Sequence, residues 1–164
     1  MGRAHTVWRA VHEGARLERT MSSEPRLVRG SCLCGSIRYE VTGELRRAVN
    51  CHCTMCRKAH GAAFRTRAAV RREDFRFTQG ESLLTRYESS PGHYRCFCSR
   101  CGSPIVSVFD ADPSTVGLPF GALDDDPGVR PLCHVHVASK APWYDITDEL
   151  PRFDEVPPSP VKGR

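Results

Sequence analysis

The chain has 164 residues and a mass of 18.3 kDa, which fits one domain with a hydrophobic core of its own. Its composition, 40% hydrophobic and 26% charged with a formal net charge of +5, excludes a disordered chain. The longest strongly apolar run, residues 104–109, is far shorter than the roughly 18 to 20 residues that cross a bilayer. The first twenty residues lack the apolar stretch of a secretory signal, so we expect a cytoplasmic protein.

The two ends of the chain differ in composition from its middle. Residues 1–25 contain several Arg residues but little apolar periodicity, which indicates a flexible N-terminal extension. Residues 157–164 are rich in Pro and poor in large hydrophobic residues, which predicts a disordered tail. The folded, zinc-binding domain is therefore expected over residues 26–156.

Short runs in which polar and apolar residues alternate dominate the middle of the chain. These runs are rich in Val, Ile, Phe and Tyr, which is typical of β-strands, and Gly and Pro between them suit hairpin turns. The sequence thus predicts a mainly β protein with short antiparallel sheets, and one short helix over residues 54–60. The expected strands cover residues 36–41, 62–70, 74–77, 83–87, 94–97, 105–109 and 134–137.

Nine cysteines are the feature that overall composition does not explain. An odd count, grouped as CxC and CxxC in a chain without a secretory signal, argues against a disulfide framework and for metal-binding thiolates. The alternative is that the cysteines are small buried hydrophobes, but the regular spacing of seven of them disfavours it. We therefore expect two Zn²⁺ ions per chain, at the two sites described next.

Two cysteine pairs are each followed by glycine, namely Cys32 with Cys34 and Cys98 with Cys101. A glycine there lets the backbone turn back so that its amides face the sulfurs. The two pairs together predict a four-thiolate site, which is structural because a closed tetrahedral shell leaves no position for substrate. A zinc ion at this site would tie the start of the domain to its middle.

The central cluster has three cysteines within six residues, Cys51, Cys53 and Cys56, and no obvious second pair. A zinc ion held by three sulfurs keeps one open coordination position, which distinguishes catalytic zinc from structural zinc. A thiol or an aldehyde oxygen could enter there, and the site would assist addition of the thiol to the aldehyde. His52 lies between two of these ligands, and we expect its ring to point outward or toward a substrate.

The remaining cysteines and histidines suggest ordinary roles. Cys96 repeats the spacing of the ligands and could compete with them, but we expect it, like Cys133, to be buried packing. His60 and His136 are expected to be satisfied or exposed imidazoles without a special function.

Positive charge accompanies the cysteine clusters, since residues 46–100 contain twelve Lys or Arg against four Asp or Glu. Nearby cations help to keep thiols deprotonated, and they would attract an anionic substrate. Alternatively, these side chains form a solvated strand face.

The same positive charge allows a zinc-stabilised binding module for nucleic acid or protein. Nucleic acid is disfavoured, because the basic residues are scattered over strands and aromatic residues are few. A thiol redox or metal-buffering role for the three-cysteine zinc is a further alternative.

Four motifs resemble, in the same order, those of the glutathione-dependent formaldehyde-activating enzyme family, which also includes centromere protein V. They are GSCLCGSIRYEV, CHCTMCRKAHGAAF, FCSRCGSPI and HVHVASKAPWYDI, and the likeness covers residues 28–157. The resemblance implies a β-tent (Mss4-like) fold with a structural zinc and an active-site zinc. It implies the same ligands as the spacing: Cys32, Cys34, Cys98 and Cys101 for the first, and Cys51, Cys53 and Cys56 for the second.

The reaction that gives the family its name adds glutathione to formaldehyde, forms S-hydroxymethylglutathione, and is classed as a carbon–sulfur lyase reaction. The resemblance therefore implies a zinc-dependent enzyme that acts on a thiol adduct, with glutathione or a similar small thiol as its substrate. Because glutathione is anionic, Arg57, Lys58 and Lys140 are candidates for binding it. His134 and Trp143 belong to the last motif and are expected near the active zinc, unless Trp143 is simply part of the core.

Overall fold

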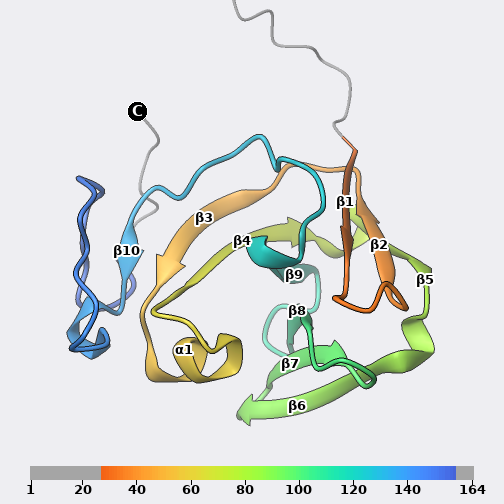
Figure 1. Ribbon diagram of the computed structural model, residues 1–164. Helices are drawn as coiled ribbons and strands as arrows, with labels where there is room; N and C mark the ends of the chain where they lie inside the picture. The colour runs from red at the N-terminus through yellow and green to blue at the C-terminus, as the bar shows by residue number, and fades with distance from the viewer. Residues whose placement is uncertain (1–26, 158–164) are drawn as a thin grey trace, which may run out of the picture.

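The computed structural model of the chain describes residues 27–157, which form a three-stranded and a seven-stranded β-sheet (Figure 1). The mainly β, antiparallel architecture expected from the sequence is confirmed. The elements in chain order are β1 (Val28–Ser31), β2 (Arg38–Val41), β3 (Arg46–Cys51), α1 (Thr54–His60), β4 (Arg65–Arg71), β5 (Phe75–Gln79), β6 (Leu84–Ser90), β7 (His93–Cys98), β8 (Pro104–Phe109), β9 (Thr115–Pro119) and β10 (His134–Val135).

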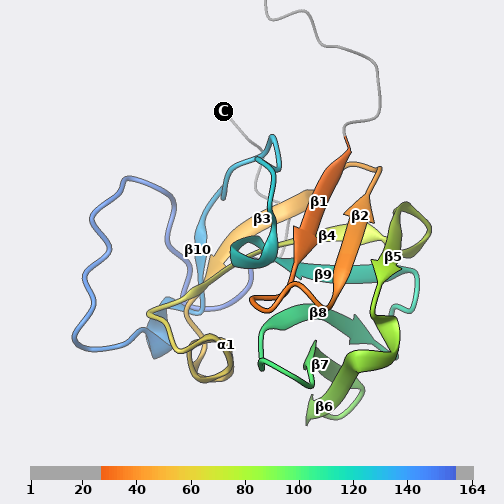
Figure 2. The same ribbon diagram turned by 45° about the vertical axis from the view of Figure 1, so that its right-hand side comes forward.

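The small sheet has the order β1-β2-β5, and the large sheet has the order β10-β3-β4-β9-β8-β7-β6. Neighbouring strands are antiparallel in both sheets, except that β10 runs parallel to β3. Figure 2 shows the small sheet lying across one face of the large one. Strand β2 illustrates why the sheets pack, since Tyr39 and Val41 enter the shared core while Arg38 and Glu40 alternate with them and face away.

All seven expected strands and the expected helix are present, and no strand end is shifted by more than three residues. The last strand, β10, is shorter than expected, because it was expected over residues 134–137 and ends at Val135. His136 adopts a left-handed φ of 57° there and opens a 3-10 turn, so the extended conformation stops. The expected extension at residues 1–25 and nearly all of the expected tail at 157–164 lie outside the described residues.

Three strands, β1, β3 and β9, are not predicted from the sequence. Strand β9 (TVGLP) is buried at four of its five positions, so it shows no alternation of polar and apolar residues. Strand β1 contains a glycine, and β3 begins with two arginines, which weakens the pattern in both. Among residues 27–157, no helix combines the length and the apolar character needed to cross a membrane.

Gly30 in β1 lies directly opposite Tyr39 in β2, and this close approach gives a first testable prediction. A Cβ atom at position 30 would lie 2.2 Å from the Tyr39 ring, which is only 1% exposed and donates its hydroxyl hydrogen to the Ala122 carbonyl. We expect Gly30→Ala to lower the free energy of unfolding by about 1 to 3 kcal/mol, because the ring has no room to move. Gly121→Ala is the control, since a Cβ there meets nothing within 4 Å. Chemical denaturation measures both variants, and equal midpoints would contradict the prediction.

Candidate metal centres

The four cysteines of the predicted structural site come together between the two sheets. Cys32 and Cys34 follow β1 of the small sheet, while Cys98 ends β7 of the large sheet and Cys101 lies in the turn before β8. All four Sγ atoms lie within 4.8 Å of one another, with 3.4 Å between Cys32 and Cys34 and 3.9 Å between Cys34 and Cys98. Zinc–sulfur bonds of about 2.3 Å give a tetrahedron with edges of about 3.8 Å, so the four sulfurs fit a zinc ion.

Two glycine turns shape this group of sulfurs. The Gly35 amide donates to the Cys32 carbonyl and the Gly102 amide to the Cys98 carbonyl, each over 2.8 Å, and both glycines have a φ near 70° that other residues adopt at a cost. The Ile37 amide donates to Cys32 Sγ over 3.2 Å. An amide that faces a sulfur stabilises the thiolate, which is the form that binds metal.

The surroundings of the two less buried sulfurs also favour thiolates. The side chain and backbone of Ser103 hydrogen-bond to Cys101 and lower the pKa of its thiol to about 5. The side chain and backbone of Ser36 lower the pKa of Cys34 in the same way. The donor set therefore fits a bound zinc ion in its chemistry as well as in its geometry.

The central trio of Cys51, Cys53 and Cys56 forms a second group at the start of α1. Cys51 ends β3, Cys53 caps the helix, and Cys56 lies in its first turn with its amide donating to Cys53 Sγ over 3.3 Å. The three Sγ atoms lie within 4.8 Å of one another, and no other His, Cys, Asp or Glu of residues 27–157 joins the group. The trio therefore fits a zinc ion that keeps a coordination position for a ligand from outside the chain.

The protons of the trio are unevenly shared when no metal is bound. Hydrogen bonds from Cys51 and Cys53, together with the positive charges of Arg95 and Arg65, hold the pKa of Cys56 well below its ordinary value. Hydrogen bonds with Cys53 and Cys56 and burial raise the pKa of Cys51. Cys56 is thus the thiolate of the group, and zinc binding would release the proton of Cys51.

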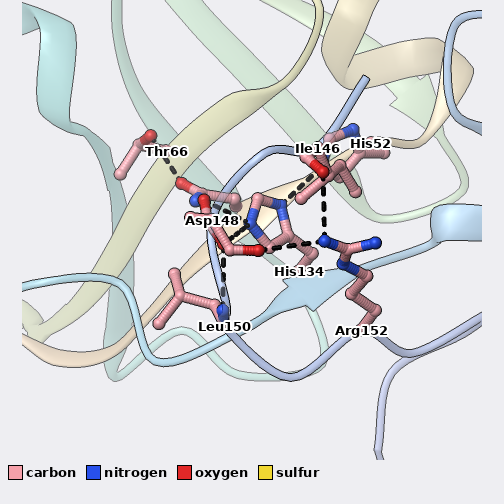
Figure 3. Close-up of polar contacts among 8 residues, drawn as sticks. His52, Thr66, His134, Ile146, Asp148, Leu150 and Arg152 are labelled. Atoms are coloured by element: carbon pink, nitrogen blue, oxygen red, sulfur yellow. Dashed lines mark hydrogen bonds and ion pairs between the residues drawn. The ribbon is translucent and has the colours of Figure 1, made fainter. Parts of the chain in front are cut away.

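A chain of two histidines and a carboxylate lies beside the trio (Figure 3). His52 Nε2 lies 2.7 Å from His134 Nδ1, and His134 Nε2 lies 3.0 Å from Asp148 Oδ2. Because a carboxylate accepts, His134 donates from Nε2 to Asp148, and in this tautomer its Nδ1 accepts the hydrogen of His52 Nε2. Both rings are fully buried, so the expectation that His52 points outward is wrong. Burial, and then the charge of His134, lowers the pKa of His52 to about 4.

The hydrogen bonds from His52 through His134 to Asp148 hold the C-terminal segment against the end of β3. Asp148 accepts a hydrogen bond from the Leu150 amide over 3.0 Å, and Arg152 Nη2 donates to the Ile146 and Asp148 carbonyls over 3.0 and 2.9 Å. The segment is thereby fixed beside the strand that carries Cys51. The histidine chain is a structural clamp that sequence reasoning missed, because the pairing of His52 with His134 spans 82 residues.

We expect His134→Ala to lower the free energy of unfolding by about 2 to 4 kcal/mol, because it opens a cavity and leaves His52 Nε2 without a partner. Thermal unfolding of the zinc-loaded protein measures the effect. Asp148→Asn serves as the milder variant, since an amide oxygen can still accept from His134, and its loss should be smaller. A His134→Ala protein as stable as the wild type would contradict the clamp.

Three of the five predicted substrate-binding residues, Arg57, His134 and Lys140, lie near His52, where their charges help to lower its pKa. Arg57 is half-buried and donates to Thr54 Oγ1 over 3.5 Å, whereas Lys58 is exposed on α1. His134 is buried in the clamp, and Lys140 donates to the carbonyls of Ala141 and Tyr144. Trp143 is 72% exposed, so the alternative that it belongs to the core is wrong.

The two cysteines outside the two groups behave as the sequence suggested. Cys96 and Cys133 are buried and belong to neither group of sulfurs, which confirms their expected place in the packing. His60 is half-buried, and burial together with the charge of Arg65 lowers its pKa to about 4, so it is neutral at physiological pH. His136 is half-buried as well.

A cleft of about 470 Å³ opens beside the trio, between α1 and strands β6, β7 and β8. Its lining includes Lys58 together with two residues that the sequence analysis did not select, Arg65 and Arg95. Arg95 Nη2 lies 3.8 Å from Cys56 Sγ, which joins the cleft to the trio. Alternation along the expected strand 94–97 gives Arg95 and Cys96 different faces, but it does not tell which residues lie opposite Arg95.

Comparisons with known proteins point to one family. The profile of the family described as glutathione-dependent formaldehyde-activating enzyme matches residues 27–139, a range that contains both groups. A Halomonas elongata protein, provisionally named a glutathione-dependent formaldehyde-activating enzyme, is 32% identical over 129 residues, which cover 73% of this chain and 81% of that protein. A crystal structure of a Rhodobacter sphaeroides protein is similar with a TM-score of 0.51 and 28% identity, over 63% of this chain and 97% of the other.

Proposed function

Because the chain belongs to the glutathione-dependent formaldehyde-activating enzyme family, we propose that it catalyses the addition of glutathione, or a similar small thiol, to formaldehyde at the central trio. The observation that carries the proposal is the convergence of three sulfurs from β3 and α1 without a fourth protein ligand among the described residues. In this reaction the thiolate forms a bond to the carbonyl carbon, and the carbonyl oxygen takes up the proton that the thiol gave up. The product is S-hydroxymethylglutathione.

Cys51, Cys53 and Cys56 would hold the zinc ion of this site. When bound, zinc supplies Lewis acidity, which lowers the pKa of a thiol and polarises a carbonyl group. The protein fixes the three sulfurs through the end of β3 and the cap of α1, so that they are oriented before a substrate arrives. The charges of Arg65 and Arg95 favour thiolates at this place.

Cys32, Cys34, Cys98 and Cys101 would hold the second zinc ion. Each of the two sheets provides part of this group, so the ion would join the sheets and keep the trio in place. Because all four positions of a tetrahedral ion would be filled by protein sulfur, this site supports the fold and has no part in the reaction.

Two measurements test the proposed function. Elemental analysis of the purified protein should find two zinc ions per chain. NMR exchange spectroscopy of glutathione with formaldehyde should show faster interconversion of free and hydroxymethylated thiol when the protein is added. An exchange rate equal to that of the uncatalysed mixture would reject formaldehyde as the substrate.

The alternative of a nucleic-acid-binding module is weakened by ion pairs on the surface. Several exposed arginines are paired with carboxylates, which lowers the positive charge that a phosphate backbone would meet. These pairs are Arg29 with Asp125, Arg71 with Asp74, Arg76 with Glu40, and Arg130 with Asp126.

A further inference from the structure

The cleft beside the trio is cationic and contains no acidic side chain among the residues that line it. Arg65, Arg95 and Lys58 provide its positive charge, while side chains such as Phe97 and Val106 provide apolar surface. An ammonium group would find no carboxylate partner in this lining. The cleft therefore suits a ligand that offers a negative charge and a short apolar chain.

The two arginines have hydrogen-bonding capacity that the protein does not use. Arg65 is only 4% exposed, donates to Ser107 Oγ over 3.1 Å, and has no partner for its Nε. In Arg95, Nη2 faces Cys56, while Nε and Nη1 are buried without a partner. Buried guanidinium groups are ordinarily matched by carboxylates, but neither arginine forms an ion pair with an Asp or Glu of residues 27–157.

The sulfurs alone do not balance this charge. A divalent zinc ion with three thiolates has a formal charge of minus one, whereas two guanidinium groups carry two positive charges. Guanidinium groups stay charged at neutral pH in proteins. At least one positive charge is left over beside the trio, which a carboxylate would neutralise.

We propose that Arg65 and Arg95 form a carboxylate-binding subsite, which anchors a carboxylate of the substrate next to the sulfur trio. This inference rests on the proposed function for the identity of the thiol, and it assigns the anchor to residues in the cleft. Because Arg95 lies 3.8 Å from Cys56 Sγ, a carboxylate on this guanidinium would be held only a few ångström from the reacting groups. The fork of an arginine binds a carboxylate through two parallel hydrogen bonds and so also sets its orientation.

Two sources could supply the carboxylate, the thiol or the aldehyde. Glutathione has two carboxylates, and formaldehyde has none, but a small aldehyde acid such as glyoxylate would place its carboxylate next to the reacting carbon. We favour the thiol, because the family reaction uses glutathione. A competing explanation is that the two guanidinium groups only neutralise the sulfurs.

Isothermal titration calorimetry with the zinc-loaded protein separates these explanations. The probe is S-methylglutathione, whose capped sulfur cannot bind as a thiolate, and the comparison ligand is its diethyl ester, which lacks both carboxylates. The variant is Arg95→Gln, and Arg95→Lys keeps the charge but loses the fork. Arg86→Gln is the matched control, because Arg86 stacks on the Tyr94 ring at 4.3 Å and does not line this cleft.

We expect S-methylglutathione to bind the wild type about ten- to a hundredfold more tightly than it binds Arg95→Gln, with Arg95→Lys in between and Arg86→Gln unchanged. The diethyl ester should bind the wild type as weakly as the acid binds Arg95→Gln. If S-methylglutathione binds the wild type, equal affinities of the acid and the ester, or equal affinities of the wild type and Arg95→Gln for the acid, would overturn the subsite.

Glyoxylate gives the second arm of the experiment. Binding of glyoxylate that depends on Arg95, without binding of S-methylglutathione, would retain the carboxylate subsite and assign it to the aldehyde. Binding of neither probe would overturn the proposal. Binding of S-methylglutathione that depends on Arg95, without faster exchange of glutathione with formaldehyde, would retain the subsite and reject the proposed reaction.

Discussion

Substitution of Cys101 by serine should prevent the domain from folding stably. Cys101 is one of four sulfurs that connect the small sheet, through Cys32, to the large sheet, through Cys98. Binding of a structural zinc ion contributes on the order of 10 kcal/mol to folding, and a serine hydroxyl replaces a thiolate ligand poorly. Since a domain of this size is stable by only about 5 to 15 kcal/mol, the expected result is insoluble protein or a large drop in melting temperature.

The control for this variant is Cys96→Ala. Cys96 is also buried in the core, two residues before Cys98, but it belongs to neither group of sulfurs. It should cost only about 1 to 2 kcal/mol and keep two zinc ions per chain. Soluble yield, circular dichroism on heating, and elemental analysis compare the two variants. If Cys101→Ser melted like Cys96→Ala, the four sulfurs would not be essential to the fold.

The sulfur groups could be anticipated because their signal is local. The glycines after Cys34 and Cys101 reveal the turns, and the spacing from Cys51 to Cys56 places three ligands on one strand end and one helical turn. The pairing of Cys32 and Cys34 with Cys98 and Cys101 is a long-range contact. It could be inferred only because a tetrahedral zinc ion needs four ligands and each pair of cysteines supplies two.

Contacts between distant residues without a chemical signature could not be anticipated. His52 and His134 lie 82 residues apart, and nothing in either local sequence says that one ring accepts from the other. Arg65 and Arg95 look like ordinary strand arginines until the register of the sheet brings them to one cleft. The excess of Lys and Arg over residues 46–100 indicated where a cationic site could lie. Only the packing shows that Arg65 and Arg95 are the two arginines of the cleft that have no carboxylate partner.

The substitution Cys53→Ser should leave the fold intact and abolish the acceleration of thiol addition. Cys53 caps α1 by accepting from the Cys56 amide, and serine is among the best residues at that position, so the helix should keep its cap. The hydroxyl does not replace the thiolate as a zinc ligand, so the protein should hold one zinc ion in place of two. Since metal activation contributes several kcal/mol to such reactions, the exchange rate should fall about a hundredfold or more.

This variant also tests the division of the seven ligands into a structural and a catalytic set. NMR exchange spectroscopy, elemental analysis and thermal unfolding are measured on Cys53→Ser and on Cys96→Ala, which removes a cysteine outside both groups. Cys96→Ala should keep two zinc ions and a folded domain. If Cys53→Ser unfolded as readily as Cys101→Ser, the trio would be part of the scaffold. Full activity of Cys53→Ser with a single zinc ion would mean that the reaction does not need zinc at the trio. The remaining ion, in the four-sulfur site, has no position for a substrate.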